Sequence, residues 1–145
     1  MLALLVAGAV TATLVFVHPG EAKRPTRAQY LAHVSAVCEV YGRKLDRIPP
    51  PIDIASPGNV LASVKPALAI LREQEARIRA IEPPRELRAR VDRFFELTDR
   101  SLAALAAVRR AAAHTDVAGI GIGLQRFGVA TTAAKAAARE IGYTC

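Results

Sequence analysis

The stretch of sequence that decides the fold is RELRARVDRFFELTDRSLAALAAV, residues 85–108. Its apolar side chains recur at spacings of three and four residues, which is the period of a helix with one buried face. Glutamate precedes arginine by four residues at Glu86–Arg90, and upstream at Glu75–Arg79, an arrangement typical of the solvated face of a helix. The segment therefore predicts a long amphipathic helix, and the residues on its apolar face are Leu87, Val91, Phe94, Phe95, Leu102, Leu105 and Val108.

Two helices are predicted before this segment. The first covers residues 27–46, begins after the capping residue Thr26, and ends at the prolines of residues 49–51, because proline lacks the amide donor that a helix needs. The second begins with serine as the cap and proline at the first helical position, at residues 56–57, and ends before the prolines at 83–84.

The last helix is predicted over residues 117–141. The turn and cap before it are residues 114–116, His-Thr-Asp, and Gly142 stands where a left-handed residue commonly ends a helix. Residues 119–123 read Gly-Ile-Gly-Ile-Gly, but the spacing is not that of a phosphate-binding loop and no strand precedes them. We interpret Gly119 and Gly123, together with the later alanines, as a smooth face for close helix packing, and the alternative is a frayed first turn.

These four helices define an all-α domain over residues 26–145. Alanine occupies 29 of the 145 positions and tryptophan is absent, a composition that favours helix over a β-sandwich. Because the connections are short and marked by proline, consecutive helices are expected to run antiparallel in an up-down four-helix bundle. The chain length supports one small domain, and residues 20–25 are expected to link it to the segment before it.

Residues 1–19 are expected to form a transmembrane or signal-anchor helix. Met1–Val17 carries no charged side chain, and as a helix it would reach roughly 25 Å, which approaches the about 30 Å of a bilayer core. The alternatives are a cleaved signal peptide, which would leave a secreted protein, and a buried core helix. Both the membrane anchor and the cleaved signal peptide would target the chain to the membrane.

The two cysteines, Cys38 and Cys145, predict a disulfide bond in an oxidising compartment. They lie near the two ends of the bundle, which antiparallel helices bring together, and they lack the spacing of a metal site. The basic residues Lys23, Arg24 and Arg27 after the apolar run instead place the body inside the cell by the positive-inside rule. We resolve this conflict by expecting an upstream translation start, with a basic segment that holds the amino end inside and leaves the body outside.

No group of residues predicts an enzyme. Histidine occurs at three positions, and none of its local proximities to serine or aspartate matches a catalytic arrangement. No metal or cofactor is expected. The formal net charge of +7 comes from arginines mixed with acids rather than from a cationic stripe with stacking aromatics, so nucleic acid is not an expected partner. General solubility is the simplest explanation of this charge, and the alternative is attraction to an anionic surface of the cell envelope.

An apolar amino end, the motif Ala-Val-Cys-Glu in the first helix of the bundle, Pro-Pro breaks and a terminal Ile-Gly-Tyr-Thr-Cys occur together in this chain. In these features it resembles a broad group of small actinobacterial proteins of the cell envelope. The resemblance implies an extracytoplasmic helical bundle with one early and one terminal cysteine, and it implies no particular activity. The matching residues, within 26–145, are Tyr30, Cys38, Pro83, Pro84, Gly142 and Cys145.

The sequence thus predicts a non-enzymatic, membrane-tethered extracytoplasmic bundle that acts as an accessory or interaction module, with an unknown envelope protein or the anionic envelope surface as its partner. The alternative is a carrier that holds a small apolar or lipid ligand between its helices. The alanine-rich last helix favours close helix contact over such a cavity. The residues expected to line the cavity are Val91, Phe95, Leu124 and Phe127.

Overall fold

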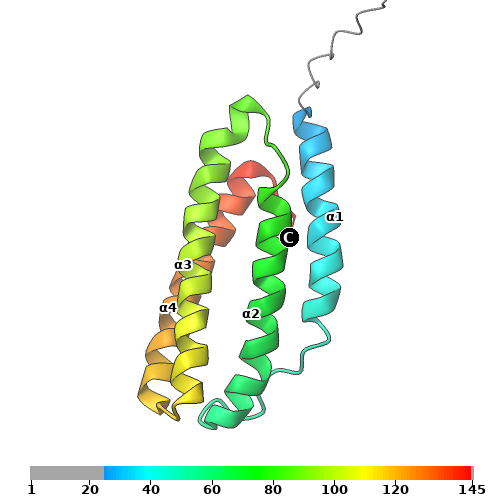
Figure 1. Cartoon of the computed structure of the whole chain (residues 1–145). Coiled ribbons are helices and arrows are strands. Elements are labelled where there is room, and N and C mark those ends of the chain that lie inside the picture. Colours follow the sequence, from blue (N-terminus) through cyan, green and yellow to red (C-terminus); the bar gives the residue numbers. More distant parts are fainter. Residues whose placement is uncertain (1–24, 145) are drawn as a thin grey trace, which may run out of the picture.

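The structure, a computed structural model, describes residues 25–144, and every regular element within this range is helical. Each long helix runs antiparallel to the one before it, and the four pack together as a bundle (Figure 1). The predicted all-α class and the four-helix bundle are confirmed for this part of the chain. The elements are α1 (Arg27–Leu45), α2 (Pro57–Arg79), the short 3-10 helix η1 (Arg85–Leu87), α3 (Arg88–Ala113) and α4 (Val117–Ile141).

The segment predicted to enter the membrane, residues 1–19, lies outside the described residues, and so does Cys145. Among the helices of residues 25–144, none combines the length and the apolar character that a membrane crossing requires. Each of α1 to α4 buries part of its surface and exposes the rest, as the apolar period of the sequence predicts.

Three helix ends follow the capping signals of the sequence, whereas Ser56, the predicted cap of α2, makes no capping hydrogen bond with its side chain. At the start of α1, Thr26 Oγ1 accepts a hydrogen bond from the Gln29 amide at 3.3 Å, and Gln29 Oε1 accepts one from the Thr26 amide at 3.0 Å. At the start of α4, Asp116 Oδ1 accepts from the Gly119 amide at 2.8 Å. Gly142 ends α4 in the left-handed region, with φ of +100°. The predicted caps and stop are therefore confirmed at these positions.

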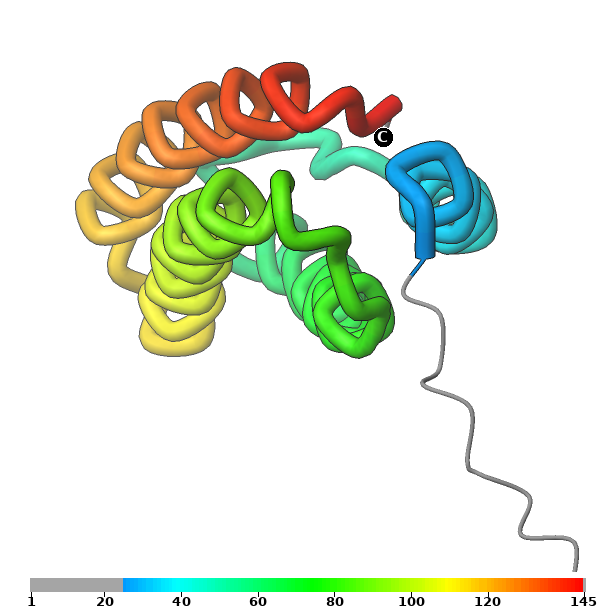
Figure 2. Tube along the Cα trace, turned by 90° about the horizontal axis from the view of Figure 1, so that it is seen from above, coloured from blue at the N-terminus to red at the C-terminus, as the bar shows by residue number. Residues whose placement is uncertain are grey.

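Helix α3 is the central helix of the bundle. It pairs most closely with α4 and next most closely with α2, whereas α1 packs mainly on α2. Figure 2 shows α1 at one side of the bundle, where the end of α4 approaches it. The bundle is therefore asymmetric, with three helices in close association and a fourth that joins them along one side and at one end.

Two clusters of buried side chains form the core. The first cluster joins α1 to the other helices and contains Tyr30, Val34, Cys38, Ile78, Leu87, Val91, Phe95, Ile141 and Tyr143. The second cluster contains Val60, Val64, Leu68, Leu102, Leu105, Ala106, Val108, Ala112 and Ile120. The second cluster is thus formed by α2, α3 and α4, while α1 contributes to the first.

The segment after α4 folds back onto α1. The hydroxyl groups of Tyr30 and Tyr143 are hydrogen-bonded to each other in the core. One turn further along α1, Ser35 Oγ lies 3.1 Å from Thr144 Oγ1. The two ends of the bundle therefore meet, as the up-down arrangement predicts (Figure 2).

Candidate functional site

A pocket of about 210 Å³ lies between α2, α3 and α4 and borders both core clusters. Its apolar lining residues are Leu71, Ile78, Phe94, Phe95, Leu102, Phe127, Ala134 and Ala138. Its polar lining residues are Gln74, Glu75, Thr98, Ser101, Thr131 and Lys135. A mostly apolar hollow with a few convergent polar groups is the usual form of a small-ligand site.

Short side chains on α4 leave the space for this pocket. Ala134 and Ala138 lie one turn apart on α4, and both line the pocket. Where α4 carries Gly123 it packs directly on α3, because a Cβ atom added there would lie 2.7 Å from Val108 Cγ2. The small residues of α4 therefore give close contact at one level and a pocket at another. The sequence-based preference for close contact describes only the first of these levels.

Three phenylalanine rings give the pocket an aromatic lining. Phe94 and Phe95 come from α3, with ring centroids 5.4 Å apart, and Phe127 comes from α4. Phe94 also packs edge-on against the Tyr143 ring, with centroids 5.1 Å apart. The pocket is thus connected by ring contacts to the segment that closes the bundle.

The hydroxyl groups of the pocket already have partners in the bundle. Ser101 Oγ on α3 lies 2.8 Å from Thr131 Oγ1 on α4, and Thr98 Oγ1 donates to the Phe94 carbonyl oxygen at 3.0 Å. Across residues 25–144, every buried side-chain nitrogen and oxygen has a hydrogen-bond partner. The hydroxyls therefore serve helix packing, which leaves the amide and the charged side chains as the groups with capacity for a ligand.

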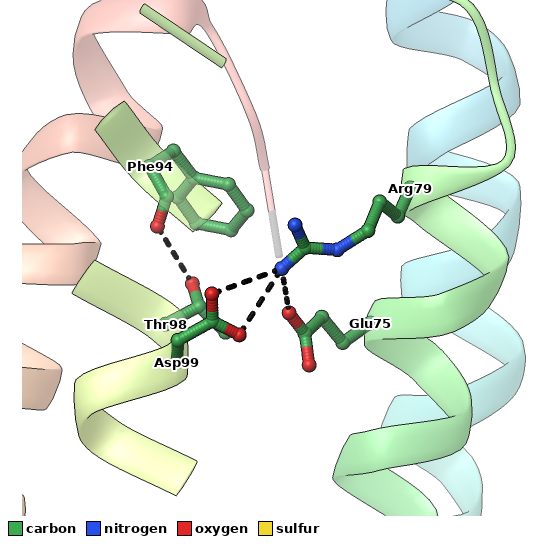
Figure 3. A network of polar contacts seen from close by, with 5 residues as sticks. All are labelled: Glu75, Arg79, Phe94, Thr98 and Asp99. Atoms are coloured by element: carbon green, nitrogen blue, oxygen red, sulfur yellow. Dashed lines mark hydrogen bonds and ion pairs between the residues drawn. The ribbon is translucent and has the colours of Figure 1, made fainter. Parts of the chain in front are cut away.

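Glu75 supplies the carboxylate among the lining residues. Its side chain is 13% exposed, and Oε1 forms an ion pair with Arg79, one turn later on α2 (Figure 3). The same Nη2 atom of Arg79 donates to both oxygens of Asp99 on α3, at 3.1 and 3.2 Å. The Arg79 guanidinium also lies 4.3 Å from the centroid of the Phe95 ring. One guanidinium thus bridges two carboxylates, and the three charges sum to −1.

The surroundings of Glu75 disfavour its charged form. Burial raises the pKa of Glu75 above its usual range, the hydrogen bond from Arg79 opposes this effect, and the neighbouring Asp99 carboxylate adds to it. The hydrogen bond to Glu75 raises the pKa of Arg79, so the guanidinium stays charged. The charged form of Glu75 is therefore stabilised by a single cation, Arg79, which it shares with Asp99.

The structure places two of the four predicted cavity residues at the pocket. Phe95 and Phe127 line it, whereas Val91 is buried in the first core cluster and Leu124 packs on the second. The prediction chose residues on apolar helix faces, and such residues fill the core as readily as they line a cavity. Ligand binding by these residues stays a prediction.

The sequence predicts that Glu75 lies on a solvated helix face, whereas the structure places it in the pocket lining. Its acid-first spacing to Arg79 predicts a solvated pair, and Arg79 is indeed 48% exposed, but the Glu75 side chain is mostly buried. One signal for this was present in the sequence. Glu75 stands four residues after Leu71 and three before Ile78, so it shares the apolar stripe of α2.

Cys38 lies in the first core cluster and is 8% exposed. Its predicted partner, Cys145, lies outside the described residues, so the disulfide stays a prediction. Thr144 contacts Ser35, which precedes Cys38 by one helical turn on α1. The described part of the chain therefore reaches α1 within one turn of Cys38.

Within residues 25–144, no group of three or more His, Cys, Asp or Glu side chains is placed to hold a metal ion. Comparison of the chain with models of protein families, with curated proteins and with solved structures gives no match. The pocket and the charged network on its wall are therefore the features from which a function is inferred.

Proposed function

We propose that this protein is a non-enzymatic binding module that holds a small, mostly apolar ligand between α2, α3 and α4. The observation that carries the proposal is the pocket of about 210 Å³ that borders both core clusters. An apolar cavity of about 150 Å³ engineered into another protein binds benzene. A pocket of the present size therefore has room for one aromatic ring with a short substituent.

The expected affinity is modest. A ligand the size of an aromatic side chain buries roughly 150–200 Å². At about 25 cal/mol per Å² this burial contributes about 4–5 kcal/mol. For a ligand held by apolar contact alone, this corresponds to a dissociation constant of about 0.2–1 mM.

A titration of the full chain with propylbenzene tests the proposal. NMR signals of the methyl groups of Leu71 and Leu102, which line the pocket, should shift and saturate. Ala134→Leu fills the pocket and should abolish the saturable shift. Ala133→Leu, the same change at a residue of α4 outside the pocket lining, should preserve it. Propylbenzene that produces no saturable shift in the unsubstituted chain would refute the proposal.

The proposal includes the compartment predicted from the sequence: a membrane tether at Met1–Val17 and an extracytoplasmic bundle held by a disulfide between Cys38 and Cys145. Support comes from Cys38 in the core and from the contact of Thr144 with Ser35 on the same helix. Mass spectrometry of non-reduced peptides should find the two cysteines linked. Two free thiols in protein isolated from the envelope would contradict both the bond and the compartment.

A second candidate function, interaction with an anionic surface of the cell envelope, is favoured by the outer face of α4. Ile122 and Val129 are 52% and 69% exposed, two turns apart, and the exposed Arg126 lies between them. Apolar side chains beside a cation suit the headgroup region of an anionic membrane.

The absence of tryptophan from the chain gives a direct test of this second function. Val129→Trp places a single reporter on the outer face of α4. We expect brominated anionic lipid to quench its fluorescence when the full chain is reconstituted in vesicles. Ile54→Trp, at an exposed position of the α1–α2 connection, is the control and should stay unquenched. Unquenched emission from both variants would contradict the interaction.

A further inference from the structure

We propose that the pocket selects a protonated amine, in which an ammonium group is joined by a short chain to an aromatic ring or another compact apolar group. This inference rests on the proposed binding function and adds the charge of the ligand to it. It is carried by the Glu75 carboxylate, the one acidic group that lines this mostly apolar pocket within residues 25–144, and by the acceptor oxygen that this carboxylate retains.

The Glu75 carboxylate has capacity for a further hydrogen-bond donor. Within residues 25–144, the donor that holds it is Nη2 of Arg79, which contacts Oε1. Figure 3 shows the second oxygen, Oε2, directed away from Arg79. A carboxylate accepts about four hydrogen bonds in all. An ammonium group, with three donors, therefore finds an acceptor at Oε2 without displacing Arg79.

The charges of the network favour a cation at this position. Glu75 and Asp99 carry two negative charges and share a single Arg79 nitrogen, which leaves the network at −1. A bound ammonium brings the network to neutrality while Arg79 keeps both of its contacts. Burial raises the pKa of Glu75 because its charge is poorly solvated, and a ligand cation reduces that cost. Hydrogen bonds between two charged groups are stronger than neutral ones.

The aromatic lining suits the remainder of such a ligand. The face of Phe95 already attracts one cation, since the Arg79 guanidinium lies 4.3 Å from its centroid. Phe94 and Phe127 supply two more rings in the same pocket. An aromatic ring of the ligand would therefore pack among these phenylalanine rings. The ammonium group of the ligand would then lie near aromatic faces and near the Glu75 carboxylate.

Lys135 lines the pocket from α4 and carries the opposite preference. Its side chain is exposed, so its long stem lets the ammonium remain in water. The Glu75 carboxylate, in contrast, is mostly buried and is fixed by Arg79. Glu75 therefore decides that the preferred ligand is a cation, and Lys135 weakens the preference for a positive charge.

Three probes of similar shape test the inference on the full chain: 2-phenylethylamine, neutral propylbenzene and anionic 3-phenylpropionate. We expect 2-phenylethylamine to bind about tenfold more tightly than propylbenzene, and 3-phenylpropionate to bind most weakly. The full chain is held in detergent micelles for these titrations, and the Ala134→Leu variant, measured in the same detergent, corrects for partitioning of the probes into the micelles.

Three substitutions separate the contributions of the charges. Glu75→Gln keeps the shape of the wall and should remove the preference for the amine while propylbenzene still binds. Asp99→Asn changes the charge of the network outside the pocket lining and should reduce the preference by a smaller factor. Lys135→Gln should tighten amine binding severalfold.

The outcomes distinguish this inference from the proposed function. Propylbenzene binding without a preference for the amine, or a preference that survives unchanged in Glu75→Gln, overturns the inference and leaves the binding function in place. Tightest binding of 3-phenylpropionate also overturns it and assigns the selectivity to Lys135. If none of the probes binds saturably, both the inference and the proposed function are wrong.

Discussion

Replacing Gly123 with alanine should leave the bundle less stable than the same change at Gly121, on the same helix, which should stabilise it. A Cβ atom at Gly123 would lie 2.7 Å from Val108 Cγ2 and 3.3 Å from the Val108 amide nitrogen. At Gly121 an added Cβ meets nothing within 4 Å. Val108 is fully buried, and its backbone belongs to α3, so relief of the contact requires the two helices to separate.

Two effects set the size of the difference between these variants. Alanine is about 1 kcal/mol more favourable than glycine inside a helix, and this gain applies at both positions. Overpacking of a tightly packed contact costs about 1–3 kcal/mol, and this loss applies at Gly123 alone. We therefore expect Gly121→Ala to raise the free energy of unfolding by about 0.5–1 kcal/mol, and Gly123→Ala to be less stable than Gly121→Ala by about 1–3 kcal/mol.

Urea unfolding followed by helical circular dichroism measures both variants. The urea midpoint of Gly121→Ala should rise, and that of Gly123→Ala should fall or, at the low end of the overpacking cost, stay clearly below that of Gly121→Ala. The slope of the unfolding free energy against urea concentration should be the same for both variants. Equal stability of the two alanine variants would refute the close approach of α3 and α4 at Gly123. The small residues of α4 would then need another explanation.

Three further changes test the core, a helix cap and the tyrosine pair. Leu102→Ala should lower the free energy of unfolding by about 2–5 kcal/mol, whereas Arg77→Ala, at an exposed position, should lower it by under about 0.5 kcal/mol. Similar urea midpoints for the two variants would show that the assigned helix faces are wrong. Thr26→Ala should cost about 1 kcal/mol in the same assay because α1 loses its capping box, and an unchanged midpoint would contradict that role. Burial raises the pKa of Tyr30 and Tyr143 above the usual 10.0, so the folded chain holds these protons more tightly than the unfolded chain. Stability should be complete below pH 10 and fall as the pH rises above it, and Tyr143→Phe should flatten this fall in thermal unfolding measured from pH 8 to 11.5.

The positions of the helices follow from local features of the sequence. A period of three and four apolar residues defines a face, and Thr26, Asp116 and Gly142 form the predicted caps and stop because their partners lie within one turn. The up-down order follows in turn from short connections. These features are local, so one sequence without relatives is enough to predict them.

The pocket depends on distances between helices, which periodicity does not specify. Ala134 and Ala138 share the apolar face of α4, and the same residues permit either close contact or open space, according to what the neighbouring helices present. Glu75 likewise has the spacing of a solvated ion pair and a place on an apolar stripe. Only the packing of α2 on α3 decides whether Glu75 is solvated or buried, because this packing brings Asp99 to Arg79 and encloses the Glu75 side chain.

The last described residues of the chain contribute to the shape of the pocket. Tyr143 is hydrogen-bonded to Tyr30 on α1, and its ring packs edge-on against Phe94, which lines the pocket from α3. A displacement of this segment from α1 would remove a neighbour of Phe94 and change the pocket lining. The contacts that close the bundle and the contacts that form the pocket thus share a side chain. The position of α1, which periodicity alone leaves open, is therefore part of what positions the candidate site.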